Sequence, residues 1–148
     1  MKFSKKSRYG LTALIDLGIN STDCKVALNS IAERNNISLQ YLEQIFAAFR
    51  RAGIVKGVKG PQGGYVLNDL PENIYLSDIL VAVDGTYHLE DEQANTPGDA
   101  EVIASTIQEV VIDRVNKVLD DLLLGITLKD LIDVYRQKGA LEQQMYYI

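Results

Sequence analysis

Cysteine and histidine are nearly absent from this sequence of 148 residues, which contains one of each. The single cysteine, Cys24, excludes an intrachain disulfide and supplies too few thiolates for a zinc finger or an iron-sulfur cluster held by the cysteines of one chain. The lone histidine, His88, is not expected to be a ligand, because a metal site needs several. We therefore expect no metal and no cofactor.

Long apolar runs and enzyme signatures are missing as well. No run approaches the roughly 18 apolar residues that a membrane-spanning helix needs, and no apolar signal segment follows the basic residues near the N-terminus. The sequence has no nucleophile elbow, and Gly60–Gly64 is not a phosphate loop because Lys-Ser/Thr does not follow it. We expect a cytoplasmic protein that is not an enzyme and does not bind membranes.

Basic residues are outnumbered, with 15 Lys and Arg against 20 Asp and Glu and a net charge of -5. The charge is unevenly distributed, however. Residues 1–60 carry ten basic and four acidic residues, a net charge of +6, whereas residues 61–148 carry five and sixteen, a net charge of -11. This asymmetry suggests that the first part faces a polyanion and the second lies away from it. The alternative is that the asymmetry has no functional meaning and that the charges are only solvated surface groups, unevenly distributed along the chain.

Hydrophobic periodicity in the first 85 residues predicts helices and one hairpin. Ser38 is placed to cap the third helix, Gly53 to end it, and Gly85 to close the fourth. Glycines between positions 60 and 64 form the tip of the hairpin. The predicted elements are helices over 7–18, 28–35, 39–52 and 76–83, and β-runs over 54–59 and 65–67.

A long helix over 100–124 dominates the second half of the sequence. Its apolar stripe has spacings of 4, 4, 4, 3 and 4 and consists of Ile103, Ile107, Val111, Val115, Val118 and Leu122. One small domain is unlikely to cover so much apolar surface, so we expect the helix to pair with its copy in a second subunit; lying across its own domain is the alternative. A polar segment that we expect to be mobile precedes this helix. A last helix starts near Thr127, and we predict little regular structure from Gly139 onward.

These patterns predict a mainly α fold with a small β-wing, a winged helix-turn-helix joined to a long dimerisation helix. The expected organisation is a DNA-binding domain over 1–85, a flexible loop over 86–99, the dimerisation helix over 100–125, and a C-terminal helix and tail over 126–148.

The third helix carries the candidate base-reading side chains. Its apolar face leaves five polar residues on the first turns: Ser38, Gln40, Tyr41, Glu43 and Gln44. Gln44 can pair with adenine and Glu43 can accept from cytosine, whereas Ser38 and Tyr41 can bond phosphate. The alternatives are that Ser38 only caps the helix and that Glu43 is only a favourable acid in its first turn.

Further DNA contacts are predicted at the start of the first helix and on the hairpin. Lysine and arginine neutralise phosphates, and a glycine lets the backbone approach DNA closely. These candidates are Ser4, Lys5, Lys6, Arg8, Lys56, Lys59 and Gly63, while Arg50 and Arg51 either contact phosphate or only cap a helix.

Two other functions remain open at this stage. Cys24 is followed by Lys25, which would favour its thiolate, so a redox-responsive regulator is one alternative; an unremarkable thiol with no resolving partner is the other interpretation of that residue. A protein-interaction module that does not bind DNA is the second, because a fold does not determine a function.

The sequence resembles the Rrf-type family of bacterial transcription regulators. The resemblance covers the whole chain and is densest over residues 1–85. It is carried by Met1-Lys2-Phe3-Ser4, Arg8-Tyr9-Gly10-Leu11, Ile31-Ala32, Ile37-Ser38, Tyr41-Leu42-Glu43-Gln44 and the wing Gly60-Pro61-Gln62-Gly63-Gly64-Tyr65-Val66-Leu67. It implies a homodimer held by the long helix, with two winged domains on a palindromic operator. It also implies a sequence-specific regulator of transcription, which we expect to be a repressor.

The sequence departs from the family at two places. Several members have arginine where this chain has Lys59, and arginine is favoured in narrow minor grooves. We therefore expect the wing of this chain to bind phosphate rather than to recognise the width of the minor groove. Cluster-binding members have three cysteines in the segment corresponding to 86–99, and this chain has none there. The chain therefore resembles the cluster-free branch, which is typified by a repressor of cysteine metabolism.

That branch suggests a role for the C-terminus. Met145-Tyr146-Tyr147-Ile148 is apolar and resembles the tail of that repressor, and cysteine synthases accept partner C-termini that end in isoleucine. We therefore expect genes of cysteine and sulfur metabolism as targets and cysteine synthase as a partner that docks at Tyr147 and Ile148. Packing of these residues on their own dimer is the alternative.

Overall fold

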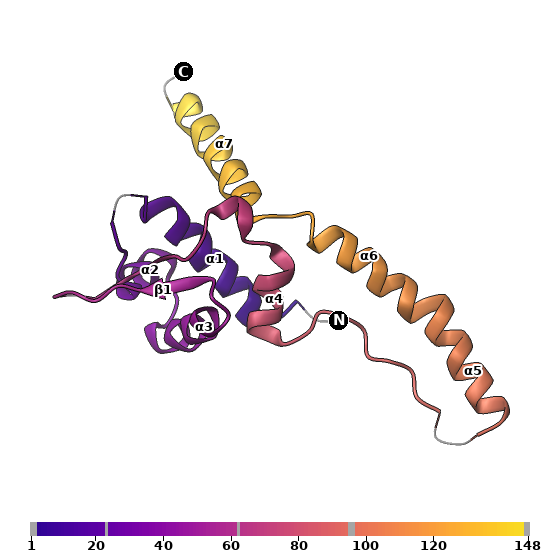
Figure 1. Cartoon of the computed structure of the whole chain (residues 1–148). Helices are drawn as coiled ribbons and strands as arrows, with labels where there is room; N and C mark the ends of the chain where they lie inside the picture. Colours follow the sequence, from indigo (N-terminus) through magenta and orange to yellow (C-terminus); the bar gives the residue numbers. More distant parts are fainter. Residues whose placement is uncertain (1–2, 23, 62, 95–96, 147–148) are drawn as a thin grey trace.

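The computed structural model describes residues 3–22, 24–61, 63–94 and 97–146, and it shows a winged domain with two helical extensions (Figure 1). The winged domain consists of α1 (Lys5–Asn20), α2 (Leu28–Asn35), α3 (Leu39–Arg51), strands β1 (Val55–Gly57) and β2 (Tyr65–Leu67), the 3-10 helix η1 (Pro71–Asn73) and α4 (Leu76–Asp84). One extension, the arm, consists of α5 (Asp99–Ile107), η2 (Gln108–Ile112) and α6 (Asp113–Leu123); the other is α7 (Leu128–Tyr146). This architecture confirms the predicted fold class. None of the described helices is long and apolar enough to cross a membrane.

The start of α1 is tied to the end of α4. Ser4 caps α1 by accepting a hydrogen bond from the Ser7 N–H at 3.0 Å. Its own hydroxyl points at both carboxylate oxygens of Asp84, at 2.7 and 2.8 Å, and the Ser7 hydroxyl donates to the same carboxylate. A carboxylate is favourable beside a helix N-terminus, because the free N–H groups there carry partial positive charge. Asp84 therefore joins the two helices.

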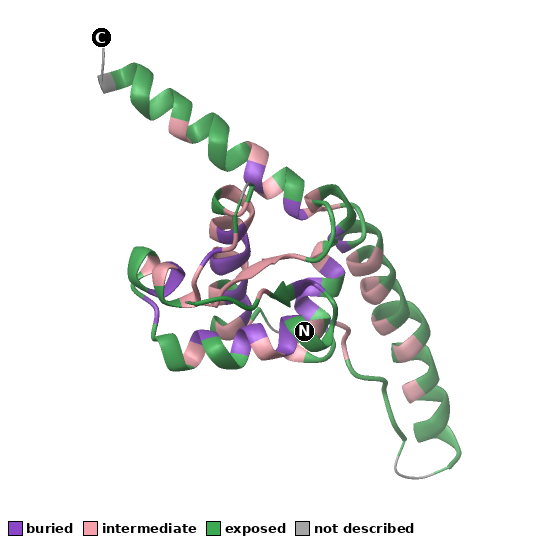
Figure 2. Ribbon diagram, turned by 60° about the vertical axis from the view of Figure 1, so that its left-hand side comes forward, coloured by how far each residue is buried: buried purple, intermediate pink, exposed green. Residues whose placement is uncertain are grey.

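The helix-turn-helix consists of α2 and α3. Asn36 ends α2 in the left-handed conformation (φ 52°, ψ 48°), which asparagine tolerates better than most residues. Ser38 then caps α3 by accepting a hydrogen bond from the Tyr41 N–H at 3.3 Å. The inner faces of the helices meet in one core, and Figure 2 shows the buried residues concentrated in the winged domain. Its largest fully buried side chains include Phe46, Phe49, Leu14, Leu17, Ile31, Leu42, Ile45 and Ile79.

The wing is an antiparallel hairpin of β1 and β2. Lys56 pairs with Val66 at its centre, and beyond the strands the Val58 N–H bonds to the Gly64 carbonyl at 2.8 Å. Near the tip, the Gly63 N–H bonds to the Gly60 carbonyl at 3.1 Å, and Gly63 has a positive φ of 58°, which glycine adopts without strain. The predicted hairpin is therefore confirmed.

The arm is helical over the predicted length, but it contains a π turn, η2, that was not predicted. Ile103 and Leu122 are nineteen positions apart, so at about 100° per residue a regular α-helix would place them about 100° apart around its axis. A π turn is a widened turn that accommodates one extra residue. With one residue accommodated in the π turn, eighteen regular α-helical residues separate Ile103 from Leu122, and at about 100° each they make about five full turns. The π turn therefore brings the two ends of the apolar stripe onto the same face of the arm.

The arm joins the winged domain through a small contact. Leu80 of α4 packs with Tyr87 and with Leu123 of α6, and Leu76 and Leu119 complete this cluster. Figures 1 and 2 show the rest of the arm standing away from the winged domain. Its orientation therefore depends on few apolar contacts.

The C-terminal helix α7 corrects the prediction of an irregular tail. It continues through Gly139 to Tyr146, because residues 140–145 are mostly good helix formers and one glycine costs only about 1 kcal/mol. Leu128 and Ile132 bury its first turns against the core. At Gly18 of α1 an added Cβ would lie 2.5 Å from the Ile132 Cδ1 atom, so the helices approach closely there. Beyond this contact α7 projects from the domain (Figure 1).

Candidate nucleic-acid interface

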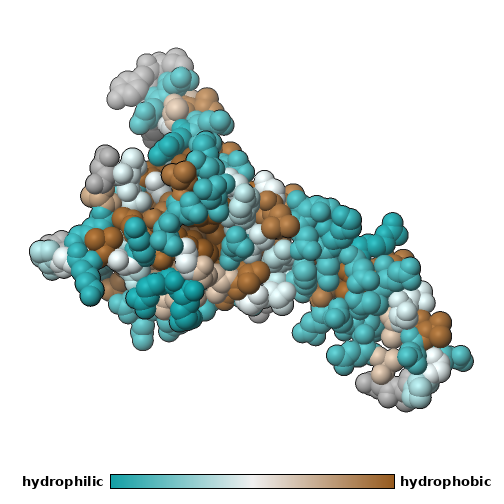
Figure 3. All heavy atoms as spheres, viewed as in Figure 1, coloured by the Kyte–Doolittle hydropathy of each residue, from teal (hydrophilic) through white to brown (hydrophobic). Residues whose placement is uncertain are grey.

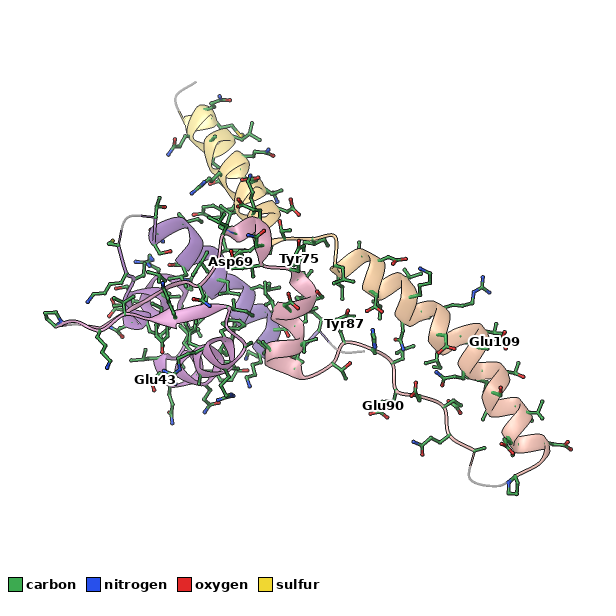
Figure 4. All side chains as sticks on the ribbon, in the orientation of Figure 1. Glu43, Asp69, Tyr75, Tyr87, Glu90 and Glu109 are labelled. Carbon is green, nitrogen blue, oxygen red and sulfur yellow. The ribbon has the colours of Figure 1, made fainter. Side chains whose placement is uncertain are left out.

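The exposed face of α3 is polar. Gln40, Glu43 and Gln44 are exposed on it, whereas Leu42 and Ile45 point into the core. Figure 4 shows Glu43 on the outer side of α3, away from α1 and α4. A recognition helix needs this arrangement, because one face must be anchored while the other enters the major groove.

The start of α1 lies beside the start of α3. The rings of Tyr9 and Tyr41 meet edge to face with centroids 5.6 Å apart, and the Lys5 Nζ lies 5.5 Å from the Tyr9 ring centroid. Lys5, Tyr9, Ser38 and Tyr41 line a shallow hollow together with Asn36 and Ile37. Residues that are distant in the sequence thus share one surface with the N-terminus of α3, whose free N–H groups favour an anion.

The predicted phosphate-binding residues of α1 differ in their availability. Lys5 and Arg8 are exposed, with the Arg8 guanidinium 4.8 Å from the Phe3 ring centroid, and Lys6 is half-buried. Ser4 is different, because its hydroxyl both caps α1 and donates to Asp84. We therefore leave Ser4 out of the interface proposed below.

The wing carries the other predicted cations. Lys56 and Lys59 are exposed, and so are Arg50 and Arg51 at the end of α3. A residue that the sequence analysis did not assign to the interface, Lys25, lies against the glycines of the wing. Its position depends on pairing between Val26 and Tyr65, a long-range contact for which the local sequence carries no signal.

Cys24 is exposed on the segment between α1 and α2. Lys25 follows it in the sequence, and Val26 then pairs with Tyr65 of the wing.

The apolar stripe of the arm is open to solvent in the single chain. Val118 is 66% and Ile103 is 61% exposed, and Ile107, Val111 and Leu122 are also exposed while Val115 is half-buried. A shallow groove along the stripe is lined by Val110, Val111, Arg114, Val115, Val118 and Leu119. Apolar patches are visible on the arm in Figure 3. The arm does not lie across its own domain, so that alternative is wrong for the single chain.

Residues 87–92, here called the strap, run along the arm and are held to it by side chains. The Tyr87 hydroxyl donates to the Asp120 Oδ1 atom at 2.6 Å, and the His88 Nε2 atom lies 2.7 Å from the same oxygen. The hydrogen bond to Asp120 and burial raise the pKa of Tyr87 to about 12, and hydrogen bonds from Tyr87 and His88 hold the pKa of Asp120 below its usual value. His88, expected to have no particular role, thus forms part of the junction between strap and arm.

The strap makes further contacts along the helix. Asn116 bonds both to the Leu89 N–H at 2.8 Å and to the Leu89 carbonyl at 3.2 Å. At the start of η2, Gln108 accepts from the Glu92 N–H at 2.7 Å and donates to Asp91 at 3.0 Å. Figure 4 shows Tyr87 and Glu90 on this segment beside the arm. The segment is irregular, as expected, but the prediction of a mobile loop did not anticipate these bonds.

Comparison with known proteins identifies the family. Residues 3–134 match the model of the Rrf2 family, described as an iron-dependent transcriptional regulator. The chain belongs to the Rrf2 family of transcriptional regulators. The regulator CymR of Bacillus subtilis is 38% identical over 152 residues, covering 100% of both chains, and IscR of Vibrio atlanticus is 36% identical over 132 residues, covering 88% of this chain and 76% of that one. A solved structure described as CymR, the global cysteine regulator of B. subtilis, superposes with a TM-score of 0.74 at 32% identity, covering 90% of this chain and 98% of that one.

Membership in the Rrf2 family makes the chain a helix-turn-helix regulator of transcription, which binds DNA and is not an enzyme. The iron in the family description does not fit the residues present here. Cys24 is the only cysteine, and the described part of the chain contains no group of three His, Cys, Asp or Glu side chains that could hold a metal ion. We assign no step to iron. The family match ends at residue 134, within α7.

Proposed function

We propose that this Rrf2-family regulator is a repressor that binds a palindromic operator as a homodimer and controls genes of cysteine and sulfur metabolism. The observation that carries the proposal is the polar face of α3, whose start shares one surface with Lys5 of α1, in a domain that also exposes lysines on its wing. Such a regulator acts on the chromosome and would work in the bacterial cytoplasm.

Base recognition is assigned to three exposed residues of α3. Gln40 and Gln44 offer an amide that pairs with adenine, and Glu43 offers an acceptor for the amino group of cytosine. Ser38 and Tyr41 at the helix start are assigned to phosphate, since backbone contacts at a helix N-terminus position the reader without specifying sequence. The remaining phosphate contacts are assigned to Lys5, Lys6, Arg8, Lys56, Lys59 and the backbone of Gly63.

The homodimer is assigned to the arm. The apolar stripe is exposed in the single chain, and η2 keeps its two ends on the same face of the arm. A second copy of the chain offers an equivalent surface. A two-fold pairing of equal surfaces places two winged domains symmetrically, and a symmetric reader matches a palindrome.

The regulon and the partner enzyme are proposed from the relatives and from the tail. The similarity to the global cysteine regulator of B. subtilis supports sulfur metabolism as the target. The docking residues Tyr147 and Ile148 lie outside the described residues, but α7 carries the chain away from the winged domain, with Met145 78% exposed near its end. If calorimetry shows that a chain without Tyr147 and Ile148 binds cysteine synthase as tightly as the full chain, the docking proposal is wrong.

Binding and footprinting on genomic DNA test the central proposal. The full chain should protect palindromic sites upstream of sulfur-metabolism genes, and transcription of those genes should rise when the regulator is deleted. Glu43→Ala should reduce discrimination at one base pair of each half-site by about 1–3 kcal/mol, or about 5- to 150-fold. Glu109→Ala, a matched change of an exposed glutamate on the arm, should not. Absence of DNA binding even at low salt would refute the proposal and favour an interaction module.

A further inference from the structure

Lys25 is held beside the wing by its neighbour in the chain. Val26 pairs with Tyr65 of β2 in both directions, its N–H bonding to the Tyr65 carbonyl at 3.0 Å and its carbonyl accepting from the Tyr65 N–H at 2.9 Å. This pairing adds a single bridge to the edge of the hairpin. It fixes the backbone at Lys25 next to the strand that leads to the wing tip.

The side chain of Lys25 extends along two glycines of the wing. A Cβ added to Gly64 would lie 3.1 Å from the Lys25 Cβ and 3.0 Å from its Cγ, and one added to Gly60 would lie 2.2 Å from its Nζ. The aliphatic stem therefore covers Gly64, and the ammonium group reaches Gly60. A larger residue at Gly64 would meet the Lys25 stem and the Val26 carbonyl, 3.1 Å away, so this glycine has a steric reason beyond the turn itself; at Gly60 the neighbour is only the flexible end of Lys25.

Lys25 forms no ion pair with the acidic residues that the structure describes. The residue is half-buried through its stem, and long basic side chains commonly cover apolar surface with the stem while the charged end stays in water. Within the described ranges no carboxylate lies within 4.0 Å of its Nζ; Asp23 is not among the described residues.

The surrounding charge favours the same partner. Lys56 and Lys59 are exposed on the same hairpin, and residues 54–67 contain no acidic residue. The two lysines of the hairpin and Lys25 packed against it thus form a basic surface that a polyanion would neutralise.

We propose that Lys25 is a third cation beside the wing, positioned by the pairing of Val26 with Tyr65 and by Gly64 to contact a DNA phosphate. This inference rests on the proposed binding to an operator and adds a contact from outside both the recognition helix and the hairpin. Because a phosphate contact carries no base information, Lys25 contributes to affinity and to salt dependence but not to sequence preference.

The test compares Lys25→Met, which keeps an apolar stem, with Lys25→Arg, which keeps the charge, and with Lys138→Met on α7 as a control for net charge. Fluorescence anisotropy would measure binding to two 30-base-pair duplexes, the strongest genomic footprint and a random sequence, between 50 and 200 mM salt. For a dimer, Lys25→Met should lower the slope of log K against log salt by about 1.8, at about 0.9 per lost contact, and should weaken binding to both duplexes by a similar factor.

Each possible outcome bears on the inference. Support requires that Lys25→Arg keep the wild-type slope and that Lys138→Met change it less than Lys25→Met does. An unchanged slope for Lys25→Met overturns the inference while the proposed function stands. Weaker binding that follows a lowered Tm at an unchanged slope also overturns it, because the role of Lys25 is then only structural. Failure of the wild type to bind either duplex overturns the proposed function itself.

Discussion

Deleting one residue from the arm should affect dimerisation differently according to whether that residue lies in the π turn. Deletion of Glu109 removes the extra residue of η2, so the helix can close into regular α turns while Ile103 and Leu122 stay in line. Deletion of Lys117 removes a residue from the regular helix α6 and rotates Val118 and Leu122 by about 100° relative to the outer part of the stripe. Both deleted residues are exposed and polar, so neither removes apolar contact area.

The expected loss follows from the exposure of the rotated side chains. Val118 is 66% and Leu122 is 57% exposed in the single chain, so covering them in a dimer would contribute about 1 kcal/mol each, given about 1.5–3 kcal/mol for complete burial. In a two-fold dimer each occurs twice, which gives about 4 kcal/mol, or about a thousandfold in the dimer Kd. Deletion of Glu109 should change the Kd by less than about tenfold.

Sedimentation equilibrium measures the dimer Kd of each variant, and circular dichroism verifies that the helices remain. Equal weakening by both deletions would refute the role assigned to η2, and so would a Lys117 deletion that leaves the dimer intact. A wild-type chain that stays monomeric would refute the proposed homodimer.

Three further changes test the winged domain and α7. Asp16→Asn should lower the urea midpoint of unfolding at neutral pH. Burial raises the pKa of the Asp16 carboxyl, but its hydrogen bonds, of which that from Arg34 is the strongest, outweigh burial and hold the pKa below its ordinary value of 3.8. Because the folded-state pKa is the lower one, this contribution is complete above about pH 4 and is lost as the pH falls through the folded-state pKa, so the wild-type advantage should shrink in urea titrations at pH 3. Asp84→Ala should cost about 1–3 kcal/mol by removing the acceptor of two hydroxyls at the start of α1, a fall in Tm of several degrees in calorimetry. Gly18→Ala should lower the Tm because its Cβ would overlap α7, whereas Gly139→Ala, with nothing within 4 Å, should raise it; the reverse order would contradict the packing of α7 on α1.

Local signals in the sequence were sufficient for most of the winged domain. Ser38 and Gly85 act through their own backbone or the next turn, and each begins or ends a helix where its residue type predicts. The exposed face of α3 followed in the same way, because a periodic apolar stripe also defines the polar face opposite to it. The sequence of the arm also carried a signal of η2. The spacings between its apolar residues are longer on average than the 3.6 residues of an α-helical turn, as a widened turn requires.

The features that escaped prediction depend on contacts between distant segments. Lys25 reaches the wing because Val26 pairs with Tyr65, thirty-nine positions further along the sequence. The strap is held by side chains of the arm that follow it by sixteen to thirty-three positions. The extent of α7 was missed for another reason. Beyond Gly139 the helix has good intrinsic propensity but no buried stripe, so hydrophobic periodicity carries no signal there.

The strap has a consequence for the spacing of the operator. An arm anchored only by Leu80, Tyr87 and Leu123 could swing at its base, and the two winged domains of a dimer could then adapt to half-sites at various separations. The bonds from the strap to Asp120, Asn116 and Gln108 are distributed over more than three turns of the arm and hold the strap and the arm together, so the two would move as one body about this cluster. One base pair inserted between half-sites would turn one of them by about 35° around the duplex, so in the proposed dimer any adaptation to such a change must come from movement at the cluster of Leu80, Tyr87 and Leu123.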